Sequence, residues 1–207
     1  FGAMKKREAT AVFGEWAALG KDEKMAQGHE SAVKNMLEAV LKNHVAYRFI
    51  DAGCGNGWVV RMVKQLKDCS AALGVDGSKK MVEKAQRIDP GGTYLKADLM
   101  TWIPNEKVDV VHAMEVVYYL DNPKTFIKSV YANWLAKNGQ LVIGIDFYAE
   151  NPVSHSWPDD CGITNMRLFS ENEWVSFFKD AGFKSVTSWR IDPKEGWAGT
   201  LVVTGRV

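Results

Sequence analysis

Three glycines at alternate positions follow one apolar run, and an acidic residue closes the next apolar run. Gly53, Gly55 and Gly57 come after residues 47–51, a predicted buried strand, and Asp76 ends residues 71–75. Because glycine has no side chain, such a turn lets a ligand rest against bare peptide and a helix N-terminus. An acid placed like Asp76 binds ribose hydroxyls in nucleotide-binding folds. The two features together predict a site for a nucleotide-like cofactor.

The spacing of the glycines differs from two common phosphate-binding loops. A dinucleotide fingerprint reads Gly-x-Gly-x-x-Gly, whereas here the third glycine comes one position early and Asp51 precedes the first. A Walker loop needs Gly-Lys-Ser or Gly-Lys-Thr, which the chain lacks. Glycine-rich turns also serve plain packing, and Asp76 would then only cap the helix that starts near Lys79.

The glycine segment resembles a known family motif. Asp51-Ala52-Gly53-Cys54-Gly55-Asn56-Gly57 resembles motif I of the class I S-adenosylmethionine-dependent methyltransferases, and residues 74–78 resemble their ribose-binding motif. Further similarity follows in the family's order at residues 94–99, 108–115 and 135–143, and covers about residues 45–207. Asn138 stands where the family often carries proline, but asparagine also tolerates a left-handed turn.

This resemblance, which is strongest to small-molecule enzymes of the type 11-like group, implies a fold, a cofactor and a reaction. The implied cofactor is S-adenosyl-L-methionine, whose methyl group moves to an N, O or S atom of a small acceptor by in-line displacement. By resemblance, the glycines lie along the methionine part of the cofactor, Asp76 accepts the ribose hydroxyls, and Asp98 accepts the adenine amino group. The implied cofactor-binding residues are Trp16, Asp51, Gly53, Gly55, Gly57, Asp76, Gly77, Ser78, Asp98, Leu99 and Met114.

Two of these acids have alternative roles. Asp51 is expected to organise the glycine turn through backbone donors rather than to touch substrate. Asp98 follows a predicted strand, where an acid commonly caps a turn.

The acceptor pocket is expected beyond the carboxyl ends of the strands. Residues 148–169 mix aromatic with titratable groups in a long irregular stretch, which is typical of a substrate loop but also of a surface connection. We expect general-base candidates at His155, Tyr118, Tyr119 and Glu115, and histidine in particular titrates near neutral pH. Residues expected to contact the acceptor are Phe13, Tyr118, Tyr148 and Trp157. An amine acceptor that binds neutral needs no strong base, and aromatic side chains would then shape a pocket for a cation.

The chain is expected to form an N-terminal extension and lid over residues 1–24 and a single methyltransferase domain over residues 25–207. Phe13 and Trp16 resemble the aromatic lid of small-molecule methyltransferases, although they could equally staple the first helix to the domain. The predicted fold is α/β, a doubly wound, seven-stranded, mostly parallel sheet with an antiparallel last strand, the Rossmann-like methyltransferase fold. Strands alternate with helices predicted at residues 25–42, 58–66, 79–87, 122–135 and 171–181, and residues 185–191 and 200–206 form a final hairpin.

Composition narrows the partners. Lys and Arg number 26 against 25 Asp and Glu, so a net charge of +1 gives no broad footprint for nucleic acid or an anionic membrane, and neither partner is expected. Cys54, Cys69 and Cys161 form neither a disulfide framework nor a metal pair, which favours a cytoplasmic setting. No metal is expected, because the acidic and histidine residues match no ligand spacing. A protein or RNA methyltransferase and a non-catalytic S-adenosylmethionine-binding regulator remain as alternatives, and the oligomeric state has no signature in the sequence.

Overall fold

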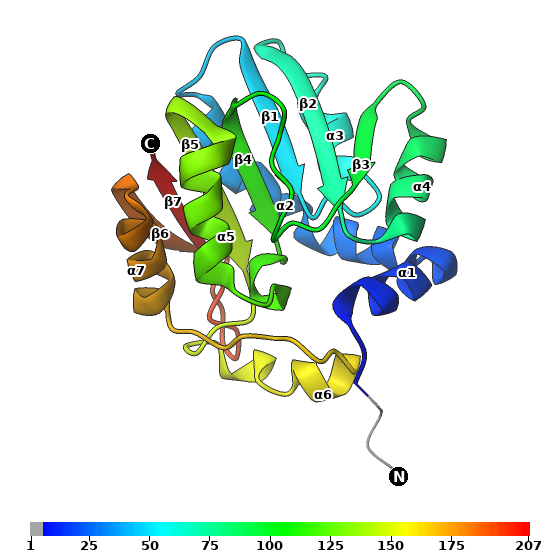
Figure 1. Ribbon diagram of the computed structural model, residues 1–207. Helices are drawn as coiled ribbons and strands as arrows, with labels where there is room; N and C mark the ends of the chain where they lie inside the picture. The colour runs from blue at the N-terminus through cyan, green and yellow to red at the C-terminus, as the bar shows by residue number, and fades with distance from the viewer. Residues whose placement is uncertain (1–5) are drawn as a thin grey trace.

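Seven strands form one sheet in the order β3-β2-β1-β4-β5-β7-β6 (Figure 1). The computed structural model describes residues 6–207. The strands are β1 Tyr47–Ala52, β2 Cys69–Asp76, β3 Thr93–Lys96, β4 Val108–Met114, β5 Leu135–Ile145, β6 Lys184–Ile191 and β7 Thr200–Arg206. β1 to β5 are parallel, whereas β7 lies between β5 and β6 and is antiparallel to both. The predicted α/β fold with an antiparallel last strand is therefore confirmed.

The strand order reverses between β1 and β4. The chain runs outward from β1 through β2 to β3 on one side, and through β4 to β5 on the other. At such a switch point the connections leave the sheet in opposite directions, so a crevice opens at the carboxyl ends of the two central strands. The sheet therefore directs ligand binding to the segments that follow Ala52 and Met114.

Helices cover both faces of the sheet (Figure 1). α2 Lys21–Leu41, α3 Trp58–Val63 and α4 Lys79–Ile88 pack on β1 to β5, and α5 Pro123–Ser129 and α7 Glu171–Ala181 pack on the other face. Neighbouring residues of a strand point to opposite faces, so Phe49 joins the core beneath α2 while Ile50 joins the core that holds Trp134 and Phe178. α1 Ala9–Leu19 and α6 Trp157–Cys161 lie beyond the carboxyl ends of the strands (Figure 1).

Local sequence signals account for several element ends. Ser170 Oγ accepts the N–H of Glu173 at 3.1 Å and the Glu173 carboxylate accepts the N–H of Ser170 at 3.1 Å, which is the capping box predicted for α7. Asn138 has φ 67°, the left-handed turn that its residue type tolerates. The helix predicted over residues 122–135 is α-helical only as far as Ser129, and a π-helical turn, Val130–Trp134, follows it. α2 begins four residues earlier than predicted, directly after Gly20.

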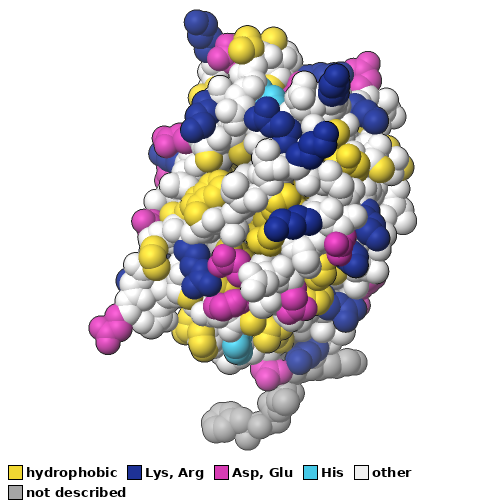
Figure 2. Space-filling model, turned by 90° about the vertical axis from the view of Figure 1, so that its left-hand side faces the viewer, with side chains coloured by type: hydrophobic (Ala, Val, Ile, Leu, Met, Phe, Trp, Pro, Cys, Tyr) yellow, Lys and Arg dark blue, Asp and Glu magenta, His cyan; other side chains and the backbone are white. Residues whose placement is uncertain are grey.

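The described surface carries charged and hydrophobic side chains together. On the face in Figure 2, basic and acidic side chains are spread among one another, and hydrophobic side chains reach the surface between them. Within residues 6–207, no helix is long and apolar enough to cross a bilayer.

Candidate functional site

A cavity of about 610 Å³ opens at the carboxyl ends of the central strands. Its walls come from the glycine turn after β1, the end of β2, residues 96–100, residues 114–116 and residues 119–121. α1 and the first half of α2 close it from the other side. The cavity therefore lies at the switch point of the sheet, where the sequence predicted the cofactor.

The glycine turn is tied to the end of β2 by backbone hydrogen bonds. The N–H groups of Gly53 and Cys54 donate to Val75 O at 2.7 and 3.0 Å, and the N–H of Gly55 donates to Asp76 Oδ2 at 2.9 Å. Gly55 has φ 53°, and a Cβ added there would meet no atom within 4 Å. Since Gly55 also lines the cavity, a side chain at this position would project into the space that a cofactor needs.

Asp76 lies at the centre of the cofactor end. Its Oδ1 accepts the N–H of Ser78 at 2.8 Å, while Oδ2 accepts Gly55 N–H. Burial raises the pKa of Asp76, and the two N–H bonds oppose that rise. Each carboxylate oxygen has lone pairs beyond those used by the backbone, so the side chain can also accept two ribose hydroxyls. The helix-capping role considered for Asp76 belongs to Ser78, whereas Asp76 supports the glycine turn and keeps acceptor capacity for a ligand.

Two residues predicted to touch the cofactor instead shape its surroundings. Ser78 Oγ accepts the N–H of Met81 at 3.3 Å and caps α4, and Ser78 does not line the cavity. Gly57 does not line it either, because the residue precedes α3 and faces the ring of Tyr94, which a Cβ would meet at 2.5 Å. Ser78 thus caps α4 and Gly57 packs against Tyr94, and neither residue borders the cavity.

Asp51 does not organise the glycine turn. Within residues 6–207, the buried side chain of Asp51 has one hydrogen-bond partner, His112 Nδ1, at 2.8 Å from Oδ1. The predicted backbone donors are absent there, because Val75 O and Asp76 accept the N–H groups of the turn instead. Asp51 still lines the cavity, so it remains a cofactor candidate.

Four residues predicted to bind the cofactor border one side of the cavity, here called the adenine side after that prediction. Gly77, Asp98, Leu99 and Met114 all line the cavity. Asp98 Oδ1 accepts the N–H of Met100 at 2.9 Å, so the turn-capping role is present as well. The second carboxylate oxygen of Asp98 has no hydrogen-bond partner among the described residues and is free to accept from a ligand.

Aromatic side chains of α1 cross the cavity. Phe13 and Trp16 line it, with ring centroids 5.1 Å apart. Phe13 also meets the ring of Tyr119 edge-on, at 5.0 Å between centroids, and so joins α1 to the segment after β4. These contacts combine the two predicted roles, because the same ring both covers the cavity and staples the helix.

Glu115 and the tyrosines after it lie at the end of the cavity where the sequence predicts the acceptor, here called the acceptor end. Glu115 lines the cavity with φ 59°, and it accepts hydrogen bonds from the Tyr118 hydroxyl and from the backbone N–H of Asp146. Burial, followed by the charge of Asp146, holds the pKa of Glu115 well above its ordinary value. Burial also raises the pKa of Tyr119, so its phenol stays protonated at neutral pH, which argues against the predicted role as a base. Tyr118 does not line the cavity, but it holds Glu115.

Three residues of the predicted substrate loop do not reach this cavity. Tyr148 is fully buried and its hydroxyl donates to Gly199 O at 2.7 Å. Trp157 stacks on Trp197, with centroids 6.1 Å apart, and exposed His155 has Nε2 at 3.3 Å from Tyr148 O. The loop folds into a short 3-10 turn, Pro152–Ser154, and α6, which turn these side chains away from the cavity.

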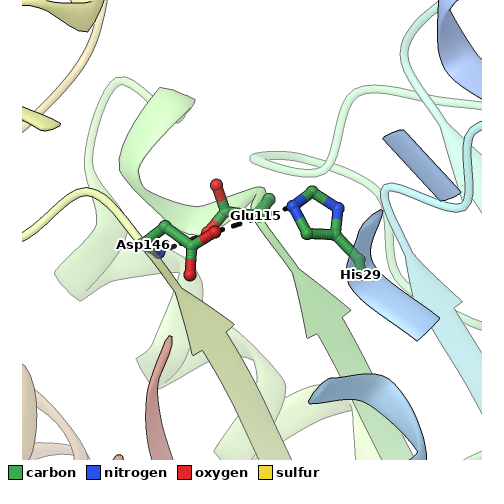
Figure 3. A group of neighbouring side chains, drawn as sticks. All are labelled: His29, Glu115 and Asp146. Atoms are coloured by element: carbon green, nitrogen blue, oxygen red, sulfur yellow. Dashed lines mark hydrogen bonds and ion pairs between the residues drawn. The ribbon is translucent and has the colours of Figure 1, made fainter. Parts of the chain in front are cut away.

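The structure adds two residues at the acceptor end that the sequence did not single out. His29 of α2 and Asp146, which follows β5, meet Glu115, and one ligand-type atom from each lies within 4.8 Å of the others (Figure 3). His29 Nε2 lies 3.6 Å from Asp146 Oδ2. Asp146 could have been found as a polar residue at the carboxyl end of a predicted strand, whereas His29 carries no motif. We name His29, Glu115 and Asp146 the acceptor cluster.

Comparisons with known proteins agree with this geometry. A family model described as a methyltransferase domain matches residues 21–188. The chain belongs to the class I S-adenosylmethionine-dependent methyltransferases. One relative is a trans-aconitate 2-methyltransferase of Rhizobium etli, which is 31% identical over 155 residues. The match covers 73% of the present chain and 55% of the relative. The chain spans about half or less of the length of the curated relatives it matches.

Solved methyltransferase structures share the fold. A chain in a complex of the Haloferax volcanii Trm112 methyltransferase activator with a methyltransferase is 26% identical, with a TM-score of 0.82, and the match covers 97% of this chain and 98% of that one. The N-methyltransferase NodS of Bradyrhizobium japonicum, solved with S-adenosyl-L-homocysteine, is 16% identical, with a TM-score of 0.66 and 86% coverage of both chains. The cofactor of the family, S-adenosylmethionine, fits the cavity described above, where Gly55 leaves open space beside Asp76.

Proposed function

We propose that this chain transfers the methyl group of S-adenosylmethionine to a small-molecule acceptor. The observation that carries the proposal is one continuous cavity, which runs from Asp76 at the cofactor end to Glu115 at the acceptor end beneath Phe13 and Trp16. Its volume of about 610 Å³ falls within the usual range of small-molecule and cofactor sites, roughly 300–1,000 Å³.

The cofactor supplies a methyl group that a sulfonium has already activated. The chain therefore contributes mainly alignment and the exclusion of water. Asp76 and the glycine turn orient the donor, Tyr119 and Glu115 border the reacting end, and the rings of α1 keep water from it. We further propose that α1 and the residues before it form the lid of a domain that begins near α2. Residues 1–5 of that extension lie outside the described part of the chain.

Transfer of a labelled methyl group tests the proposed function. Purified protein is incubated with methyl-labelled S-adenosylmethionine and a cell extract, and the label is followed into the small-molecule, protein and RNA fractions. We expect label in the small-molecule fraction that survives treatment of the extract with protease and nuclease. Label that disappears with either treatment would identify a protein or RNA acceptor, and cofactor binding without any transfer would identify a regulator.

A second subunit is a further candidate partner of this chain. The Haloferax volcanii structure, in which the methyltransferase is bound to the Trm112 activator, supports this candidate. We therefore propose to test whether the activity of this chain depends on a Trm112-type protein. The labelled-methyl assay is repeated with and without an added Trm112-type protein, and light scattering after size-exclusion chromatography reports whether a stable complex forms. Equal activity and no complex would leave the chain as an enzyme that acts without this partner.

A further inference from the structure

The acceptor cluster brings together three elements that are far apart in the sequence. Figure 3 shows His29 from α2, Glu115 from the end of β4 and Asp146 from the end of β5 pointing toward one another. Glu115 and His29 both line the main cavity. Asp146 and His29 line an adjoining cavity of about 470 Å³. The cluster therefore stands at the junction of two hollows, one of which holds the cofactor end.

Both carboxylates are fixed and keep unused acceptor capacity. Thr200 Oγ1 donates to Asp146 Oδ1 at 2.6 Å, and Oδ2 faces His29 at 3.6 Å, which exceeds a normal hydrogen bond. The Tyr118 hydroxyl and the Asp146 N–H hold the two oxygens of Glu115. Because every carboxylate oxygen has more than one lone pair, the cluster can receive several N–H donors from a ligand without moving.

The lining of the main cavity is mainly acidic. The acidic residues that line it are Glu8, Asp22, Asp51, Asp76, Asp98, Glu115 and Asp121. Among the described residues, Lys96 is the one lysine of the lining and no arginine contributes to it. Lys96 ends β3, which β2 and β1 separate from β4, so the one lysine of this lining lies away from the cluster. A polycarboxylate such as trans-aconitate would need several basic side chains, whereas the described lining of the adjoining cavity offers one, Lys194, among the acidic residues Asp146, Asp192 and Glu195.

We propose that the acceptor is a small primary or secondary amine, held by Glu115 and Asp146 with its nitrogen turned toward the methyl donor. This inference rests on the proposed function and names its substrate class. The amine enters as an ammonium ion that complements the two carboxylates. The Tyr119 ring, which lines the same end of the cavity, adds a face for the alkyl part or the cation.

The ammonium ion must lose a proton before its nitrogen can accept the methyl group. The ammonium ion gives one proton to His29 or to Glu115, whose pKa burial has already raised. The freed lone pair of nitrogen then forms the new N–C bond while the C–S bond breaks, and the electron pair of that bond stays on sulfur. The charge passes from the sulfonium to the methylated nitrogen. His29 borders both cavities, so it can pass the proton to solvent.

The wild-type protein provides the first test. S-adenosylmethionine with an isotope-labelled methyl group is supplied with a small-molecule extract, and separately with tyramine, putrescine and trans-aconitate, and NMR of the labelled carbon reports the atom to which the methyl is bound. We expect N-methyl products, from the extract and from at least one amine. Label on oxygen or sulfur alone would overturn the amine inference but leave the proposed methyl transfer intact. No transfer to any fraction, although the cofactor binds, would overturn both.

Variants test the cluster itself. Asp146→Asn and Glu115→Gln should raise the KM for the amine roughly 10- to 100-fold, because each removes a charged hydrogen-bond partner, with cofactor affinity close to wild type. Glu195→Gln is the matched control, since Glu195 lies in the adjoining cavity and outside the cluster. An unchanged KM in both cluster variants would overturn the assignment of the amine to this site.

A divalent cation is the competing occupant, because imidazole and carboxylates also bind metals. The transfer assay is therefore repeated after dialysis against a chelator, with and without added Mg²⁺ or Zn²⁺. Activity that survives chelation supports direct binding of the amine by the cluster. Activity that is lost on chelation and restored by one of these ions would overturn it.

Discussion

Asp76 joins the ends of β1 and β2, because its Oδ2 accepts the N–H of Gly55 at 2.9 Å. The residue predicted to bind the ribose is thus also a structural support of the glycine turn. Removing its carboxylate should affect two measurable properties at once.

We expect Asp76→Ala to weaken the binding of S-adenosylhomocysteine and to lower the free energy of unfolding. Charged hydrogen bonds contribute on the order of 1.5–3 kcal/mol each, so affinity should fall about tenfold or more. Titration calorimetry measures the affinity, and urea denaturation measures the stability. Wild-type affinity in a folded Asp76→Ala protein would remove this residue from the cofactor site.

Gly53 and Gly55 should respond differently to a methyl group. A Cβ on Gly53 would collide with the side chain of Val116, whereas a Cβ on Gly55 would enter open space at φ 53°. Gly53→Ala should therefore cost about 1–3 kcal/mol of stability, part of it recovered in the double variant Gly53→Ala/Val116→Ala. Gly55→Ala should mainly lower cofactor affinity. Similar losses of affinity and stability in the two single variants would contradict this assignment.

Phe13→Ala should loosen α1 over the cavity. Its ring packs on Trp16 and Tyr119, and such aromatic pairs contribute about 0.5–1.5 kcal/mol beyond the area they bury. Hydrogen exchange of α1, measured with and without S-adenosylhomocysteine, should be faster in the variant in both states. Leu19→Ala is the control, because Leu19 lies on the same helix with 69% of its surface exposed. Equal exchange in Phe13→Ala and wild type would show that the ring does not hold the helix.

Glu115 should make stability depend on pH. Its folded-state pKa lies well above the ordinary value of 4.5, chiefly through burial, so the folded state binds a proton more tightly than the unfolded state does. The contribution of Glu115 is fully present below pH 4.5 and is lost as the pH rises from there to the folded-state pKa. We expect Glu115→Gln to gain stability relative to wild type over that range, measured by urea denaturation in a pH series. A constant difference would mean that the carboxyl is ionised in the fold without a penalty.

His155→Ala should leave cofactor affinity near wild type and change turnover by no more than about twofold. The side chain is exposed and does not line the cavity, and substitutions at such positions usually alter energies by less than about 0.5 kcal/mol. A pH-rate profile of the variant checks this once an acceptor is known. Loss of an ionisation near neutral pH would show that His155 is the base predicted from the sequence.

The sequence predicted those features of the fold and of the cavity that local chemistry determines. The turn at Gly53 to Gly57, the acid at Asp76 and the capping box at Ser170 each depend on residues within one short segment, and the structure contains all three. The turn-organising role predicted for Asp51 was wrong because its partner, His112, lies 61 positions away on the neighbouring strand. No periodicity in the sequence reports that contact.

Residues 148–169 make contacts that the sequence did not predict. Their mixture of aromatic and titratable groups suggested a substrate loop, but Tyr148 is buried by contacts with Gly199 and Arg190 from the final hairpin. His29 was overlooked for a related reason: it stands in a helix whose pattern reports only packing. Its meeting with Asp146 depends on how α2 crosses the end of β5, which is a property of the assembled fold.

Gly20 alone separates α1 from α2, with φ 75° and no atom within 4 Å of an added Cβ. α1, before Gly20, carries Phe13 and Trp16, whose rings cover the cavity, and α2, after Gly20, carries His29. A change in the angle between the two helices would thus alter the distance of these rings from the strand ends, while the strand ends stay where they are. Within this architecture, enzymes could come to accept larger or smaller molecules by remodelling one N-terminal joint, while the cofactor half of the site is inherited unchanged.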